Sequence, residues 1–177
     1  MQKAFPLDKK KAQLTWSLCF FIIICSVVIQ THLFLNRDAN WLMEVTRRFL
    51  QGGDYGTAFF DVTPPMILFI QAPFVYLAEH LNFNLIVAGR LMSYSIGLLS
   101  LMLISLQLKR GFIQNSSAFY VTCLLLLSLL YFIIPGTEFC ERECLMVIMV
   151  MPYFFMTALK KNSISLSLSL RIIIGVL

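Results

Sequence analysis

Acidic side chains gather in two short polar stretches of a chain that is otherwise strongly apolar. Asp38 and Asp61 belong to the first stretch, residues 36–63. The second stretch, "PGTEFCERECL", holds three glutamates, namely Glu138, Glu141 and Glu143. Carboxylates act as general bases, and their oxygens are the ligands that hard divalent cations prefer. These residue types therefore favour a site that moves a proton or holds a cation such as Mg or Mn.

Asp38 stands where a long apolar run, residues 14–35, gives way to polar sequence. A carboxylate at the edge of a hydrocarbon layer has water on one side only. We therefore expect desolvation to raise its pKa, which suits a general base. The alternative is that Asp38 is the N-cap of the helix that follows. Asp61 either caps the next helix, takes part in binding substrate, or orders the turn in front of that helix.

Four arginines are candidates for binding the phosphate of a lipid or a substrate, namely Arg47, Arg48, Arg90 and Arg142. Arg90 lies within an apolar run, residues 85–108, where a charge is costly and commonly functional. A guanidinium group also makes multidentate contacts with phosphate. The alternatives are headgroup contacts for Arg47 and Arg48, a side chain of Arg90 that reaches the interface, and a local Glu–Arg pair for Arg142.

Glu138 and Glu143 are the candidate metal ligands of the second stretch, and a solvated loop is the alternative. Cys140 and Cys144 flank "ERE" in the same stretch. Four residues apart, they form either a strained local disulfide or two soft metal ligands. The sequence leaves both possibilities open.

The elements that carry these residues are predicted to be membrane helices. The chain of 177 residues is 59% hydrophobic and 13% charged, whereas soluble domains are about half apolar and a quarter charged. About 20 apolar residues span a bilayer as a helix. We predict an all-α, polytopic membrane protein with four full spans and a partial fifth, at about residues 14–35, 85–108, 118–135, 144–159 and 166–177. The last run stops after about a dozen residues, which predicts the N-terminal part of a larger protein.

The basic residues stand at the ends of apolar runs, which is typical of membrane orientation and not of nucleic-acid binding. Lys9–Lys11 place the N-terminus in the cytoplasm. If residues 64–81 stay on the outer face, the pairs Lys109-Arg110 and Lys160-Lys161 are cytoplasmic too, and both acidic stretches are outside. If residues 64–81 span, all of these positions are inverted. Charge therefore predicts that residues 64–81 lie on the outer leaflet, in a bacterial inner membrane.

Residues 36–84 are accordingly predicted to be an outer loop with two interfacial helices. The first, residues 39–51, places Trp41 on an apolar face with Leu42, and it ends at Gly52-Gly53. The second covers residues 64–81, and Pro73 kinks it. The whole chain, residues 1–177, forms a single transmembrane module.

Several short motifs occur in a characteristic order over about residues 10–175. They are Asp38, Gly53 with Tyr55, Asp61 with Pro64-Pro65-Met66, and Ala88-Gly89-Arg90-Leu91 with Ser93. This order resembles the GT-C superfamily of integral-membrane glycosyltransferases, in the branch related to protein mannosyltransferases and lipid A aminoarabinose transferase. The later "ERECL…MPY" is similar to an R-E-H-L…P-Y stretch of uncharacterised bacterial members, with Cys144 at the position of the histidine.

The resemblance implies a sugar donor linked to polyprenyl phosphate and an acceptor glycan, lipid or protein. It implies that Asp38 is the base that deprotonates the acceptor, with Glu141 or Glu138 as the acid of the second loop. Arg90, with Arg47 or Arg48, would contact the phosphate. Family members have more spans, so a truncated, inactive fragment or a non-catalytic membrane scaffold is the alternative. A transporter subunit ranks last, because the predicted spans carry few charges.

Overall fold

A computed structural model of the chain describes residues 9–54, 56, 66–111 and 117–161. This part holds α-helices and one 3-10 turn, and no strand occurs in it: α1 (Lys9–His32), α2 (Arg37–Leu50), α3 (Met66–Leu81), α4 (Leu85–Gly111), α5 (Ser117–Phe132), η1 (Gly136–Glu138) and α6 (Arg142–Lys161). The all-α prediction is confirmed for these residues. Asp61 and the predicted partial span at residues 166–177 lie outside them.

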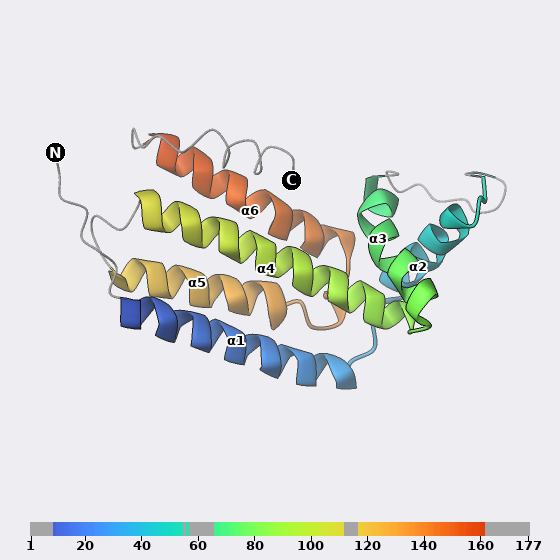
Figure 1. Cartoon of the computed structure of the whole chain (residues 1–177), viewed down its shortest axis with the longest axis horizontal. Coiled ribbons are helices and arrows are strands. Elements are labelled where there is room, and N and C mark those ends of the chain that lie inside the picture. Colours follow the sequence, from blue (N-terminus) through green and yellow to red (C-terminus); the bar gives the residue numbers. More distant parts are fainter. Residues whose placement is uncertain (1–8, 55, 57–65, 112–116, 162–177) are drawn as a thin grey trace.

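Four helices form a layer in the order α1, α5, α4, α6, which we call the four-helix layer (Figure 1). Each helix packs on the next one in this order. α1 and α5 run in one direction, and α4 and α6 run in the other. The helix ends that carry Lys9–Lys11, Lys109-Arg110 and Lys160-Lys161 therefore lie together at one end of the layer.

The opposite end of the layer carries α2 and α3, which we call the crossed pair. These two helices pack on each other and on the first part of α4, and they do not extend the layer (Figure 1). Thr46 of α2 donates a hydrogen bond of 2.7 Å to Gln71 of α3, and both side chains are buried. The turn η1 and the start of α6 lie at this same end of the layer.

The α1 helix has an inverted distribution of polarity. Its buried residues share one face at spacings of four, seven and four, and they are Thr15, Cys19, Ser26 and Gln30. Its exposed side chains are large and apolar, and they include Leu14, Phe20, Phe21, Ile24 and Val28. Burial of polar groups without partners is costly, so the buried stripe must be hydrogen-bonded.

Hydrogen bonds satisfy that buried stripe across the layer. The Ser26 hydroxyl donates to the carbonyl of Phe132 at 2.6 Å and lies 2.9 Å from the Tyr94 hydroxyl. The Gln30 amide donates to the carbonyl of Gly136 at 2.7 Å. Both carbonyls belong to the end of α5 and the turn after it, where intrahelical donors run out. The polar face of α1 thus completes the hydrogen bonding of its neighbour.

The proline within α6 is matched to a hydroxyl of α4. Pro152 has no N–H, so the carbonyl four residues earlier, on Ile148, loses its intrahelical partner. Ser100 donates to this carbonyl at 2.7 Å and lies 3.0 Å from the Tyr131 hydroxyl. Gln107 donates to the carbonyl of Pro152 itself at 3.0 Å. The centre of the layer is therefore held by polar contacts between helices.

Two described helices, α1 and residues 85–109 of α4, are long and apolar enough to cross a membrane. α3 and α5 are apolar but have 16 residues each. α4 is more than half buried, like the core helix of a soluble protein, and α1 lies near the N-terminus, where signal sequences also occur. Length and composition alone therefore do not establish four spans.

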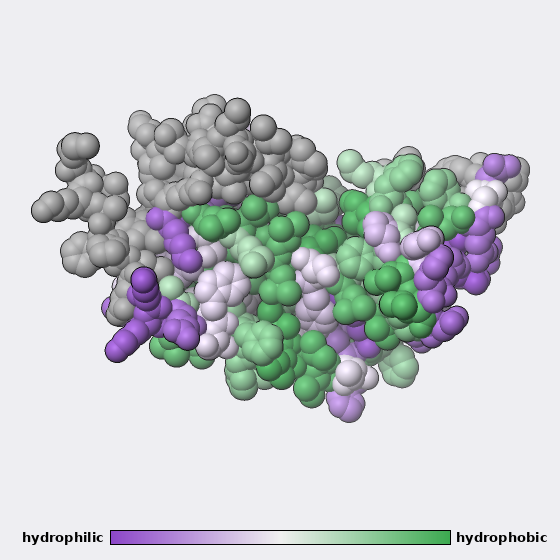
Figure 2. Space-filling view, in the orientation of Figure 1, coloured by the Kyte–Doolittle hydropathy of each residue, from purple (hydrophilic) through white to green (hydrophobic). Residues whose placement is uncertain are grey.

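The surface of the molecule is divided by polarity. On the face drawn in Figure 2, hydrophobic side chains cover the middle, and hydrophilic side chains gather towards the two ends. The exposed apolar side chains come from every helix of the layer, for example Phe21 of α1, Met102 of α4, Leu126 of α5 and Phe154 of α6. Isolated exposed apolar residues are ordinary, but a continuous apolar surface marks contact with a membrane or a partner.

Candidate functional site

The two acidic stretches of the sequence meet at the end of the four-helix layer that carries the crossed pair. Asn36 joins them. Its backbone N–H donates to the carbonyl of Thr137 at 3.2 Å, and its side-chain amide donates to Glu138 at 2.7 Å and also to Glu141. These contacts link residues that are about a hundred positions apart in the chain.

Asn36 is also the N-cap of α2, since its side-chain oxygen accepts from the backbone N–H of Asp38 at 3.4 Å. The alternative role of Asp38 as the N-cap is therefore wrong, and α2 begins at Arg37, two residues before the predicted start. Sequence reasoning missed Asn36. The signal was present, because Asn directly before a helix is among the preferred N-cap residues.

Glu138 and Glu141 form a carboxyl pair. The hydrogen bond between them lowers the pKa of Glu138, as does the Asn36 amide, and raises the pKa of Glu141 to about 7. The negative charges of Glu138, Glu143 and Asp38 act in the same upward direction on Glu141. Two carboxyl groups in contact do not both ionise readily, so the pair holds one proton below about pH 7.

Asp38 lies in the first turn of α2 with its side chain exposed. It is close enough to Glu141 for its charge to act on the pKa of that residue. A carboxylate near the start of a helix also interacts favourably with the helix dipole. The structure therefore brings together Asp38, Glu138 and Glu141 from the two acidic stretches, with Asn36 between them.

Arg90, half-buried in the second turn of α4, contacts the backbone just before the first acidic stretch. Its Nη2 donates to the carbonyl of Leu33 at 2.8 Å, directly after the end of α1. Its Nε is buried and, among the described residues, has no hydrogen-bond partner. Arg90 thus holds the connection between α1 and α2 in place just before the first acidic stretch.

Arg47 and Arg48 form ion pairs on the outward side of α2. Glu44 accepts from Nε and Nη2 of Arg47, each at 2.8 Å, and from Nε of Arg48 at 3.1 Å. Arg48 also lies over the ring of Trp41, 5.8 Å from its centre. Trp41 is accordingly turned away from Leu42, which is buried, so the predicted shared apolar face is wrong at Trp41.

The second acidic stretch contains further contacts that do not join the carboxyl pair. Arg142 and Glu143 form an ion pair of 2.6 Å at the start of α6. Cys140 and Cys144 are free thiols, so the disulfide possibility is wrong. Burial raises the pKa of Cys140 to about 11, which keeps this thiol protonated.

The described residues contain no group of three or more His, Cys, Asp and Glu side chains placed to hold a metal ion. Glu138 contacts Glu141, whereas Glu143 pairs with Arg142. The divalent cation stays a prediction of the sequence.

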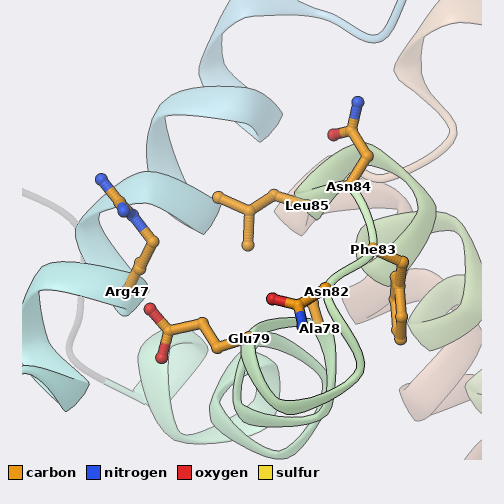
Figure 3. Close-up of a pocket in the computed structure, with 7 residues that line it drawn as sticks. All are labelled: Arg47, Ala78, Glu79, Asn82, Phe83, Asn84 and Leu85. Atoms are coloured by element: carbon orange, nitrogen blue, oxygen red, sulfur yellow. The ribbon is translucent and has the colours of Figure 1, made fainter.

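A separate, open cavity of about 380 Å³ lies where α2, α3 and the start of α4 meet (Figure 3). Arg47 of α2 and Glu79 of α3 line it from two neighbouring helices, and Phe83 and Leu85 contribute apolar surface. Asn82 has a φ of 52° and accordingly ends α3 in the left-handed conformation that Asn tolerates. No residue of the carboxyl pair lines this cavity.

Comparison of the chain with protein family models, with curated protein sequences and with solved structures finds no match. The resemblance to the GT-C superfamily therefore rests on the order of the sequence motifs, and it stays a prediction.

Proposed function

We propose that the chain is a polytopic membrane protein with its carboxyl site on the outer face. The distribution of polarity supports this location. α1 buries serine, threonine and glutamine and exposes leucine, phenylalanine and isoleucine, which is the reverse of a surface helix in water. In hydrocarbon, helices associate through small and polar residues instead. Serine hydroxyls that bond the carbonyls of Phe132 and Ile148 fit this pattern.

The orientation follows from the two ends of the four-helix layer. The lysine-rich helix ends lie together at one end, which the positive-inside rule assigns to the cytoplasm. The crossed pair and the described parts of both acidic stretches lie at the other end and are assigned to the outer face. α3 is then an interfacial helix, and its exposed side chains fall on one apolar face that includes Met66, Phe69 and Leu77.

We further propose that the site belongs to a glycosyltransferase of the GT-C type, with a sugar donor linked to polyprenyl phosphate. The observation that carries this proposal is the junction at Asn36, which places Asp38 of the first acidic stretch beside the carboxyl pair of the second. A transferase needs a base for the acceptor next to the membrane surface where the lipid phosphate lies. The junction supplies three carboxyl groups at that position.

The proposed reaction assigns a separate task to each group. Asp38 takes the proton from the acceptor hydroxyl or amine while the acceptor atom forms a bond to the anomeric carbon. The bond from that carbon to the phosphate oxygen breaks, and the polyprenyl phosphate leaves as an anion. The guanidinium group of Arg90 stabilises this developing charge. Glu141, with a pKa of about 7, relays the proton onward.

The proposal is tested by sugar transfer in membranes that carry the full-length protein with Asp38→Asn or Glu141→Gln. We expect Asp38→Asn to lower turnover at least about 100-fold, which is the usual contribution of a general base. Glu143→Gln is the matched control, because Glu143 pairs with Arg142 outside the carboxyl pair. Unchanged turnover with Asp38→Asn would remove the assignment of the base.

A non-catalytic scaffold is the second candidate, and the same junction favours it in one respect. Asn36 and Gln30 donate hydrogen bonds to the second acidic stretch, and Arg90 donates to the carbonyl of Leu33 just before the first, which a purely structural role also requires. The two candidates differ in Asp38, whose exposed carboxylate does not bond to the second loop. Under the scaffold alternative, Asp38→Asn leaves both folding and every membrane activity unchanged.

A further inference from the structure

The cavity at the crossed pair has the lining of a ligand site that is distinct from the carboxyl site. Small-molecule pockets measure about 300–1,000 Å³ and combine apolar walls with a few placed polar groups. This cavity, at about 380 Å³, is lined by an arginine, a glutamate and two asparagines together with Ala78, Phe83 and Leu85. Arg47 is nine residues beyond Asp38 on α2, which is about 14 Å along a helix.

The polar groups of the cavity retain unused hydrogen-bonding capacity. Glu44 occupies Nε and Nη2 of Arg47, so Nη1 of this guanidinium is left for another acceptor. Glu79 accepts from Gln51 at 2.8 Å through Oε1, which leaves its second oxygen. Among the described residues, the side-chain amide of Asn82 has no partner, and Figure 3 shows its oxygen directed towards the space between Arg47 and Glu79.

The charges around the cavity indicate the kind of ligand. Arg47 and Glu79 bring a cation and an anion to the cavity from two helices, and with the neighbouring Glu44 and Arg48 the four charged side chains sum to zero. A ligand that carries one negative and one positive group complements both side chains without leaving a net charge. An anionic ligand would complement Arg47 but would be repelled by Glu79.

The surroundings of the cavity favour a lipid. Glu79 lies beside the exposed apolar face of α3, where Tyr76, Leu77 and Leu81 are 55%, 44% and 63% exposed. With α3 at the membrane surface, as proposed above, this face lies at the depth of acyl chains. The cavity itself then lies at the depth of headgroups.

We propose that this cavity binds the headgroup of a zwitterionic phospholipid that carries a phosphate and an amine. Arg47 binds the phosphate through Nη1, and Glu79 accepts a hydrogen bond from the ammonium group. Asn82 contributes a further hydrogen bond, and the acyl chains lie along the exposed face of α3. The proposal depends on the membrane location but not on sugar transfer.

Native mass spectrometry of the full chain in detergent tests this site by counting retained lipid. The probes are dioleoyl-phosphatidylethanolamine and dioleoyl-phosphatidylglycerol, which have the same chains and different headgroups. We expect retention of phosphatidylethanolamine to exceed that of phosphatidylglycerol. Arg47→Gln and Glu79→Gln should each weaken the binding of phosphatidylethanolamine about tenfold, which corresponds to the loss of one charged contact. Glu79→Gln should also reduce the discrimination between the two lipids.

Arg37→Gln is the matched control, because it removes the same charge from an exposed position on the same helix. It should leave the retention of both lipids unchanged. Circular dichroism should show that all three variants remain folded. Soluble glycerophosphoethanolamine separates the two sources of the headgroup. Competition by this solute at millimolar concentration supports a headgroup site, whereas competition without any retained lipid overturns the lipid assignment. Equal retention of the two lipids, or unchanged retention in Arg47→Gln and Glu79→Gln, overturns the proposal.

Discussion

Helices α1 and α2 follow each other in the chain and bury opposite kinds of side chain. α1 buries a polar stripe that includes Ser26 and Gln30, and it exposes apolar residues on its other faces. α2 buries a mostly apolar face, namely Ala39, Leu42, Met43, Val45 and Thr46, and it exposes its ion-paired arginines. In both helices the exposed side chains are those that the proposed surroundings solvate best, and the surroundings differ. Under the proposed membrane location, α1 faces hydrocarbon, and α2 faces water or the membrane interface.

A charge on the exposed face of α1 should have the largest effect on the difference between α1 and α2. Phe21, near the middle of α1, is 63% exposed. Phe21→Asp should disfavour membrane insertion by about 3 kcal/mol, the apparent cost of Asp at the centre of a spanning helix. An insertion assay that scores glycosylation of flanking acceptor sites measures this cost.

Phe34→Asp is the control for that experiment, because Phe34 is 90% exposed and lies in the connection between α1 and α2. Its effect should remain within about 0.5 kcal/mol, as for ordinary surface substitutions. If Phe21→Asp is equally mild, α1 does not face hydrocarbon.

A glycine distinguishes the tight packing of the layer from the looser contact with the crossed pair. A Cβ atom at Gly97 would lie 2.7 Å from the ring of Phe132, which is buried against Tyr94 and Tyr131. Gly97→Ala should therefore destabilise the protein by about 1–3 kcal/mol through overpacking. Thermal unfolding in detergent measures the change.

Gly89→Ala provides the comparison on the side of the crossed pair. Its Cβ would meet the flexible end of Met43 at 3.3 Å, so the neighbour can move aside. We expect a smaller loss of stability than for Gly97→Ala. A larger loss at Gly89 would show that the crossed pair, and not the layer, is the rigid part.

Ser100 and Pro152 can be compared in a double-mutant cycle, because the Ser100 hydroxyl bonds to the carbonyl that Pro152 leaves without an intrahelical donor. Ser100→Ala removes the donor from the Ile148 carbonyl and should cost about 1 kcal/mol. In a Pro152→Ala background the N–H of residue 152 can bond to that carbonyl, so Ser100→Ala should cost less. Equal costs in the two backgrounds would mean that Ser100 acts only through the Tyr131 hydroxyl. Unfolding in denaturant gives the four free energies.

The carboxyl pair predicts that the stability of the protein depends on pH, chiefly through Glu141. The folded-state pKa of Glu141 is about 7, above its ordinary value of 4.5. The stabilisation from its proton is therefore fully present below about pH 4.5 and is lost as the pH rises through about 7. The lowered pKa of Glu138 acts in the opposite sense, with stabilisation that is lost as the pH falls below its ordinary value.

Glu141→Gln keeps the uncharged form at every pH, so the fall in melting temperature between pH 5 and pH 8 should become smaller. Glu143→Gln should retain most of that fall, because Glu143 pairs with Arg142. An unaltered pH profile in Glu141→Gln would show that the pair does not hold the shared proton.

The sequence predicted the elements well and their contacts poorly. The long apolar run before Arg110 predicted a helix from residue 85, and α4 begins at Leu85. The polar stripe of α1 was hidden, because single serines and threonines in an apolar run do not produce a strong period. The junction at Asn36 was beyond reach, since it depends on how two loops about a hundred residues apart meet. The carboxylates were identified by type, but the amide that joins them was not.

We propose that the two ends of the four-helix layer lie on opposite sides of a membrane. Cysteine labelling tests it directly, in a chain whose five native cysteines are replaced by alanine, with Phe34→Cys at one end and Lys9→Cys at the other. Both positions are exposed. We predict that a membrane-impermeant maleimide labels Phe34→Cys in intact cells and labels Lys9→Cys only after permeabilisation. Equal labelling of both positions in intact cells, or the reverse order, would show that the two ends do not lie on opposite sides in this orientation.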